Sequence, residues 1–220
     1  MIPDQFPVYL VSWEESVLLA KKLAWLVKEV KPLPDLVIAI GRGGYVPARV
    51  VCDFLLTTQL TSIRVEHWGP AARCSESALV RFPLSIPVTG MNLLVIDDVT
   101  DTGKTLMATV EYLERQEPAS IRTGVLHHKD TSCFCPDYFA EPVHEWRWIV
   151  YPWALHEDLT GFLQLVLTPI PASLVEMGVA LRERFQMQAS QSDLSDAAEE
   201  LVRQGNAIKM GGLYRAFVRG

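Results

Sequence analysis

Apolar and polar residues near the start of the chain follow the spacing of an amphipathic helix. From Val17 to Val27 the apolar residues recur so that they share one face of a helix. Ser12 and Glu15, three residues apart, form the capping-box pattern that starts such a helix. Pro32 cannot continue the helical hydrogen-bond ladder, so the sequence predicts that the helix ends before it.

Short apolar runs then alternate with further helical segments through the middle of the chain. Asp35–Ile40 and Leu93–Asp97 are short, β-branched and apolar on both faces, which is typical of buried strands. Other expected elements are strand-like pieces near Ser62–Glu66 and Ser77–Phe82, strands at Ile121–Leu126 and Trp146–Val150, and helices through about Leu56 and over Thr105–Gln116. This alternation predicts an α/β fold with a mostly parallel twisted sheet flanked by helices.

The pattern changes in the last quarter of the chain, where helical periodicity replaces strand-like runs. Two helices with serine N-caps are expected there, namely Ala172–Gln188 with Ser173 and Leu194–Arg203 with Ser192. We therefore expect a domain over residues 1–159 and a helical C-terminal extension over residues 160–220.

Composition and charge exclude several classes of protein. Hydrophobic residues make up 49% and charged residues 21% of the chain, as in ordinary globular proteins. A formal net charge of −6 does not suggest the basic face that nucleic-acid binding needs, so no nucleic-acid partner is expected. The sequence shows no signal-peptide pattern, no apolar run long enough to span a bilayer and no paired cysteine framework. We expect a cytoplasmic protein that does not associate with membranes.

The segment after the second buried strand carries the clearest chemistry. Asp97 and Asp98 end the strand, and the sequence Asp-Thr-Gly-Lys-Thr over residues 101–105 leads into the next helix. Backbone N–H groups, the positive end of the helix dipole and threonine hydroxyls would form a cradle for a phosphate monoester. A nucleotide-binding P-loop needs a glycine where this chain has Asp98. The two carboxylates instead suit the cis hydroxyls of a phosphorylated ribose.

Residues 95–105 resemble the signature of the type I phosphoribosyltransferases, which is an apolar strand, two acidic residues, two further residues and Asp-Thr-Gly-Lys-Thr. The glycine-rich turn over residues 41–44 resembles the pyrophosphate loop of the same family, in the Arg-Gly-Gly form of xanthine-guanine enzymes. That family often has a cis peptide just before this Arg-Gly-Gly sequence. The resemblance covers about residues 11–159 and implies the type I phosphoribosyltransferase fold, with the C-terminal extension outside it.

The resemblance implies a site for phosphoribosyl pyrophosphate (PRPP) at the carboxyl ends of the strands. The PRPP-binding residues that it implies are Arg42, Gly43, Asp97, Asp98, Asp101, Thr102, Gly103, Lys104 and Thr105. In the purine-specific members, the residue that matches Asp101 also lies near N7 of the base. Asp101 is therefore the expected general acid/base.

Three further matches concern the purine and a metal ion. Lys129 follows a strand and matches the lysine that contacts the exocyclic oxygen of the base, although an exposed lysine is the competing interpretation. Trp148 and Ile149 match the residues that hold the purine, with the neighbouring tryptophans as alternatives or as core residues. The resemblance also implies Mg²⁺, for which Glu157 and Asp158 are the acidic residues near the family's position; Asp158 is the expected ligand, and a solvated loop is an equal alternative.

The resulting hypothesis is a transferase that moves phosphoribosyl from PRPP to a 6-oxopurine (xanthine, guanine or hypoxanthine) in purine salvage. An alternative is a regulator that senses PRPP or a nucleotide without catalysis, and a third is an acceptor such as adenine, orotate or uracil. The mobile catalytic loop of the family would lie within residues 59–90, where His67–Gly69 departs from the familiar Ser-Tyr pair. The resemblance also implies a homodimer or higher homo-oligomer.

Overall fold

A computed structural model describes residues 5–68 and 74–217, with the backbone alone over residues 66–68 and 74–79. Gly69 of the expected mobile loop lies outside the described residues, as do the side chains of His67 and Trp68. The chain forms two compact units. The larger unit is Trp13–Trp146, and the smaller unit combines Met1–Ser12 with Arg147–Gly220.

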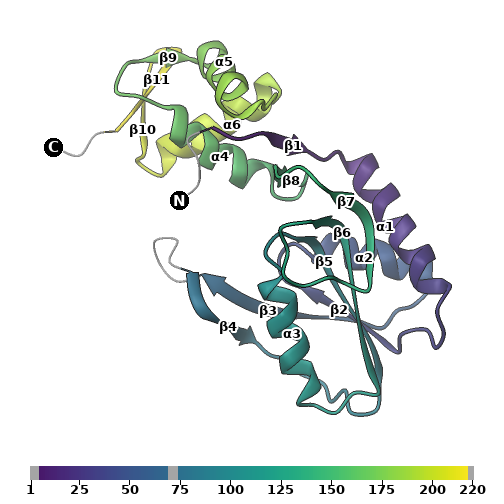
Figure 1. The fold of residues 1–220 in the computed structure, drawn as a ribbon. Coiled ribbons are helices and arrows are strands. Elements are labelled where there is room, and N and C mark those ends of the chain that lie inside the picture. Colours follow the sequence, from purple (N-terminus) through teal and green to yellow (C-terminus); the bar gives the residue numbers. More distant parts are fainter. Residues whose placement is uncertain (1–4, 69–73, 218–220) are drawn as a thin grey trace. The chain divides into compact units, whose positions relative to one another are not determined.

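A six-stranded sheet forms the centre of the larger unit (Figure 1). Its strands are, in their order across the sheet, β4 (Cys74–Phe82), β3 (Leu60–Trp68), β2 (Leu36–Ile40), β5 (Asn92–Thr100), β6 (Ser120–Lys129) and β7 (Tyr138–Val143). Only the β3–β4 pair is antiparallel among these neighbours. The mostly parallel sheet predicted from the sequence is therefore confirmed, and the carboxyl ends of β2, β5 and β6 meet at one edge.

Helices cover both faces of this sheet, because successive side chains of a strand point to opposite faces. The helices of the unit are α1 (Trp13–Lys28), α2 (Tyr45–Leu55) and α3 (Lys104–Glu114). Leu93 and Val95 of β5 share a buried cluster with Leu106 of α3. On the other face, the backbone of Gly124 in β6 lies against the side chains of Ile96 and Leu23, and Leu23 belongs to α1. The sheet is thus buried on both sides, as its doubly apolar strands predict.

The smaller unit joins the two ends of the chain. Strand β1 (Val8–Leu10) pairs in parallel with β8 (Trp148–Val150) as a separate two-stranded sheet. The remaining elements are α4 (Leu155–Val166), β9 (Ala172–Ser173), α5 (Leu174–Phe185), α6 (Gln191–Arg203), β10 (Ala207–Met210) and β11 (Leu213–Ala216). The ring of Phe6 lies 5.9 Å from that of Phe162 and 5.0 Å from that of Phe185, so the N-terminal segment is part of this unit's core.

The structure differs from the sequence prediction in the smaller unit. The units divide between residues 146 and 147 rather than after residue 159, because β8 pairs with β1 and the apolar face of α4 packs with α5 and α6. The C-terminal part also contains the three-stranded sheet β10–β11–β9 and is not purely helical. Ser173 caps α5 as expected, with a complete capping box to Glu176. The prediction of Ser192 as the cap of α6 was wrong, since Ser190 holds that position and accepts from the backbone of Asp193.

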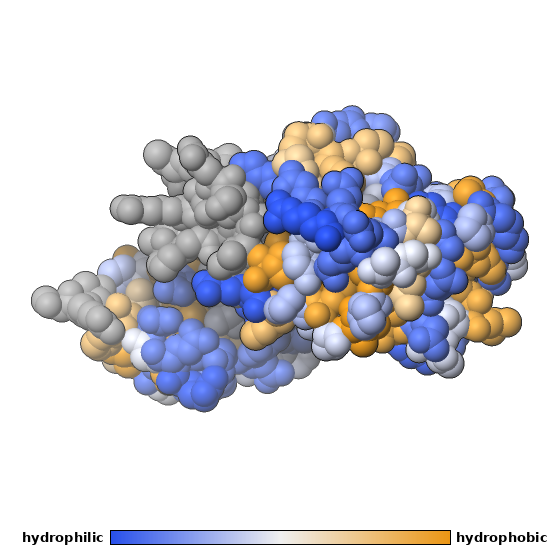
Figure 2. Space-filling model, turned by 90° about the horizontal axis from the view of Figure 1, so that it is seen from below, coloured by the Kyte–Doolittle hydropathy of each residue, from blue (hydrophilic) through white to orange (hydrophobic). Residues whose placement is uncertain are grey.

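Hydrophilic and hydrophobic side chains alternate in small patches on the face shown in Figure 2. Among the described residues, no helix is both long and apolar enough to cross a membrane.

Candidate active site

The acidic pair lies within the last part of β5, whereas the sequence predicts that the strand ends at these two residues. β5 extends to Thr100, so Asp97 and Asp98 keep strand geometry and their backbone positions are fixed by the pairing with β6. Gly43, in the turn after β2, has its α-carbon directly against the Asp98 carboxylate. A β-carbon at position 43 would overlap that carboxylate, so glycine is required for the close approach. The two motifs recognised in the sequence therefore meet.

The turn that carries Arg42 is closed against β5. The Gly41–Arg42 peptide bond is cis, which confirms the expectation for this loop. A β-carbon at Gly44 would collide with the carbonyl oxygens of Ile96 and Ile40, so the backbone of the turn is pressed onto the two central strands. Arg42 thus starts from a fixed backbone at the same edge of the sheet as the acidic pair.

The electrostatics of the acidic pair are unfavourable when no ligand is bound. Burial of its carboxyl group and the neighbouring charge of Asp98 raise the pKa of Asp97 well above its ordinary value of 3.8. A hydrogen bond from the backbone N–H of Asp98 to Asp97 Oδ1, at 3.0 Å, acts in the opposite direction and is the smaller effect. Ligand hydroxyls that donate hydrogen bonds would offset this repulsion.

The turn between β5 and α3 has the form of an anion cradle. Gly103 is the N-cap of α3 with φ of 79°, a conformation that favours glycine. A glycine brings no side-chain acceptor to the first N–H groups of the helix, which therefore suit an external anion. Lys104 and Thr105 are the first two residues of α3, so all of residues 101–105 border this helix terminus.

Lys129 and Asp101 form a charged pair next to the cradle. Lys129 is the last residue of β6, and its Nζ lies 3.1 Å from Asp101 Oδ2 and 5.1 Å from the ring centre of Trp146. Its side chain is only 3% exposed, so the interpretation as an exposed lysine was wrong. Burial lowers the pKa of Lys129, whereas the Asp101 charge and hydrogen bond raise it. The pair places a donor and an acceptor side by side.

Similarity to known proteins agrees with this geometry. Residues 12–158 match the family described as the phosphoribosyl transferase domain. The chain belongs to the phosphoribosyltransferase family. It is 30% identical over 146 residues to a xanthine-guanine phosphoribosyltransferase of Nitratidesulfovibrio vulgaris (strain DP4), covering 66% of this chain and 84% of that relative.

Solved structures support the same assignment. A purine phosphoribosyltransferase from Pyrococcus horikoshii Ot3 superposes with a TM-score of 0.58 at 27% identity, over 66% of this chain and 93% of that one. The xanthine-guanine-hypoxanthine phosphoribosyltransferase of Helicobacter pylori superposes with a TM-score of 0.59 over 69% of this chain and 96% of that one. At 18% identity the second shows the shared fold alone. The protein is thus a phosphoribosyltransferase with the type I fold.

The remaining predicted site residues of this phosphoribosyltransferase belong to the smaller unit. Trp148 and Ile149 lie in β8, and Asp158 lies in the first turn of α4. The ring of Trp148 packs against the buried cluster of the smaller unit, and its Nε1 is buried without a hydrogen-bond partner among the described residues. The purine-binding roles of Trp148 and Ile149 and the metal-binding role of Asp158 stay predictions.

Two features of the site escaped the sequence analysis. The sequence offers Trp146 as a core residue or as an alternative stacking ring, but in the structure its ring lies next to the ammonium group of Lys129. The segment Thr131–Phe134, between β6 and β7, lies against the turn of residues 101–105, which is called the phosphate loop below. No pattern in the sequence indicates either contact, because both depend on the pairing of β6 with β5.

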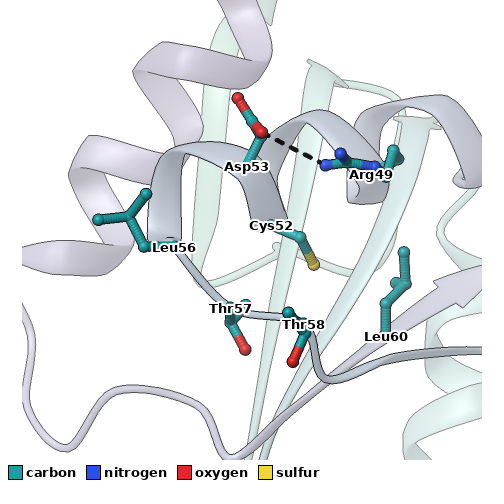
Figure 3. A pocket seen from close by; sticks show the side chains of 7 residues that line it. All are labelled: Arg49, Cys52, Asp53, Leu56, Thr57, Thr58 and Leu60. Atoms are coloured by element: carbon teal, nitrogen blue, oxygen red, sulfur yellow. Dashed lines mark ion pairs between the residues drawn. The ribbon is translucent and has the colours of Figure 1, made fainter.

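A separate pocket of about 490 Å³ lies near the amino-terminal end of β3, opposite to the carboxyl ends of the strands (Figure 3). Its lining comes from the end of α2 and the start of β3, and includes the ion pair of Arg49 with Asp53 at 3.6 Å. Because α2 runs away from the carboxyl end of β2, this pocket is remote from the phosphoribosyltransferase motifs.

Proposed function

We propose that this phosphoribosyltransferase transfers the 5-phosphoribosyl group from PRPP to a 6-oxopurine, namely xanthine, guanine or hypoxanthine, in purine salvage. The observation that carries the choice of acceptor is the contact between Lys129 and Asp101. A 6-oxopurine offers a carbonyl oxygen that accepts hydrogen bonds and, in one tautomer, an adjacent N7–H that donates. An ammonium group beside a carboxylate complements this edge of the purine base. Adenine presents a donating amino group where the 6-oxopurine has its oxygen.

The chain's own residues would bind the two halves of PRPP at one edge of the sheet. The phosphate loop suits the 5-phosphate, and Asp97 and Asp98 suit the ribose hydroxyls. Arg42, in the turn against β5, provides a planar donor fork for pyrophosphate oxygens. This arrangement would hold the leaving group and the incoming base in line, on opposite sides of the ribose carbon.

The proposed chemistry is a displacement at C1′ of the ribose. The bond from purine N9 to C1′ forms while the bond from C1′ to the pyrophosphate oxygen breaks, and the electron pair leaves with pyrophosphate. The N7 proton of the base passes to the carboxylate of Asp101. Lys129 would hold the exocyclic oxygen, which gains negative character as N7 loses its proton.

Mg²⁺ is expected to accompany PRPP. Among the described residues no cluster of three or more histidine, cysteine or acidic side chains could hold a metal ion by itself. This fits an ion bound by one or two carboxylates together with substrate oxygens, which is the usual manner of Mg²⁺. The carboxylates of Asp97 and Asp98 are among the donors at the proposed PRPP site, and Asp158 remains the candidate suggested by resemblance. The ion would offset the charge of pyrophosphate.

The test is a pyrophosphate-release assay with PRPP and a panel of bases. We expect turnover with xanthine, guanine or hypoxanthine that exceeds turnover with adenine, orotate and uracil. A preference for adenine or a pyrimidine would refute the acceptor. PRPP binding without turnover on any base would instead favour a regulator that senses PRPP. A double variant, D97N with D98N, serves as the control for PRPP binding and should lose it.

A further inference from the structure

The segment between β6 and β7 makes several contacts with the phosphate loop. The hydroxyl of Thr131 donates to the carbonyl oxygen of Asp101 at 3.3 Å. The backbone N–H of Cys133 donates to the carbonyl oxygen of Thr102 at 3.1 Å. The thiol of Cys133 donates to the same oxygen at 3.0 Å. Both carbonyl groups of the loop are thus held from one side.

These contacts also set the direction of the loop's N–H groups. In a trans peptide the C=O of one residue and the N–H of the next point in opposite directions within one plane. The two peptide bonds that follow Asp101 and Thr102 are not among the cis bonds of the chain. Holding the two carbonyls toward the 131–134 segment therefore turns the N–H groups of Thr102 and Gly103 away from that segment.

The packing around Gly103 supports the same geometry. A β-carbon at this glycine would lie 2.5 Å from Ser132 Oγ and 2.6 Å from the β-carbon of Phe134. The segment itself is tied down, since Ser132 accepts from the backbone N–H of Phe134 at 3.2 Å and its own N–H donates to the carbonyl of Lys129 at 2.9 Å. The backbone of the phosphate loop at Gly103 therefore packs closely against a hydrogen-bonded segment, which restricts rotation of its peptide groups.

We propose that Cys133 is a positioning residue for the 5-phosphate of PRPP. Its N–H and thiol fix the plane of the Thr102–Gly103 peptide, and this plane directs the Gly103 N–H at the phosphate. The inference rests on the proposed function, because it requires PRPP as the ligand. The thiol is exposed, so a reagent can reach and change the very group that makes the contact.

Three variants separate this role from a general effect on folding. C133A removes the thiol donor, C133S keeps a donor, and C135A is the matched control, since the Cys135 thiol donates at 3.7 Å to Pro136 within its own segment. We expect C133A to raise the KM and the Kd for PRPP about two- to fivefold, which corresponds to one weak hydrogen bond. The kcat and the KM for the base should remain at the wild-type values. C133S should restore most of the affinity and C135A should resemble wild type.

A second measurement uses the exposed thiol directly. Iodoacetamide converts the thiol to a thioether with loss of iodide and a proton, which removes the donor and adds bulk beside the loop. We expect PRPP to slow the alkylation of Cys133 more than the alkylation of Cys135, and peptide mass spectrometry would measure both rates. Alkylated wild type should lose more than about tenfold in PRPP affinity, whereas C133S treated in the same way should keep its affinity.

The outcomes distinguish the two proposals. If wild type binds PRPP and both C133A and the alkylated protein bind it equally well, the role of Cys133 is refuted and the proposed function stands. A lower kcat with an unchanged KM for PRPP would mean a smaller fraction of folded enzyme, and would also refute the positioning role. If wild type does not bind PRPP at all, the proposed function falls and this inference falls with it.

Discussion

The ammonium nitrogen of Lys129 lies 3.1 Å from Asp101 Oδ2, which joins the end of β6 to the turn after β5. We predict that K129M lowers kcat/KM for a 6-oxopurine about 10- to 100-fold, the effect of one hydrogen bond to a charged group. The KM for PRPP should change little. K22M is the matched control, because Lys22 forms an exposed ion pair with Glu141 at 3.6 Å. Steady-state kinetics with each substrate varied in turn would check this, and an equal loss in K22M would contradict it.

The raised pKa of Asp97 predicts a link between pH and stability. The folded protein holds this proton more tightly than the unfolded chain, where the pKa is near 3.8. The stability from Asp97 is therefore fully present below pH 3.8 and is lost as the pH rises through the raised value. D97N should increase the free energy of unfolding at pH 7 by an amount on the order of 1 kcal/mol, while PRPP binding is lost.

Urea unfolding of D97N and wild type across pH would measure this effect. The difference in unfolding free energy should shrink as the pH falls toward 3.8. D53N, which changes an exposed carboxylate paired with Arg49, should differ from wild type by less than about 1 kcal/mol at every pH. A D97N protein less stable than wild type at neutral pH would disprove the assigned burial and repulsion.

Gly103 and Gly90 have similar backbone angles, so their alanine variants separate the effect of backbone strain from the effect of steric fit. Gly103 has φ of 79° and Gly90 has φ of 75°, but a β-carbon at Gly90 would meet nothing within 4 Å. Both G103A and G90A should lose about 1–2 kcal/mol of stability from the left-handed backbone. Only G103A should lose PRPP affinity, because its β-carbon would also push against Ser132 Oγ. Calorimetric titration with PRPP would check this, and equal affinity in both variants would argue against the fit at the loop.

The N-caps of the smaller unit offer a test that is independent of the active site. S173A and S190A should each destabilise the protein by about 1 kcal/mol, since both remove an acceptor from a helix N-terminus. S192A should have a smaller effect, because Ser192 is not the cap of α6. Thermal unfolding would rank the three variants, and kcat and both KM values should stay unchanged. A larger loss in S192A than in S190A would contradict the assigned cap.

Local patterns were sufficient for most strands and helices of the larger unit and for its phosphate loop. β2 and β5 were predictable because they are apolar on both faces, and Asp101 and Gly103, which follow β5, indicate the cradle directly. β7 was missed because Glu141 and Pro142 interrupt its apolar pattern, which an edge strand tolerates. In the smaller unit, the hairpin β10–β11 was also missed, although its two-residue turn, Gly211–Gly212, is a recognisable hairpin signal.

Other parts depend on contacts between distant residues and could not be predicted from local patterns. β1 has three residues, too few for periodicity, and it acquires strand geometry by pairing with β8, which lies within the predicted strand Trp146–Val150. The burial of Lys129 and the contact of Cys133 with Thr102 depend on the alignment of β6 with β5. No spacing of residue types along the chain encodes that alignment.

The pairing of Val8 with Trp148 has a consequence for the order of events during synthesis. The ribosome delivers β1 and Phe6 before the larger unit, but their strand partner and the rings of Phe162 and Phe185 come only after the whole of that unit. Since domains generally fold as units during translation, the larger unit can acquire its sheet before the strand partner of β1 has been synthesised. The smaller unit is therefore completed after the larger one, although part of it is synthesised before.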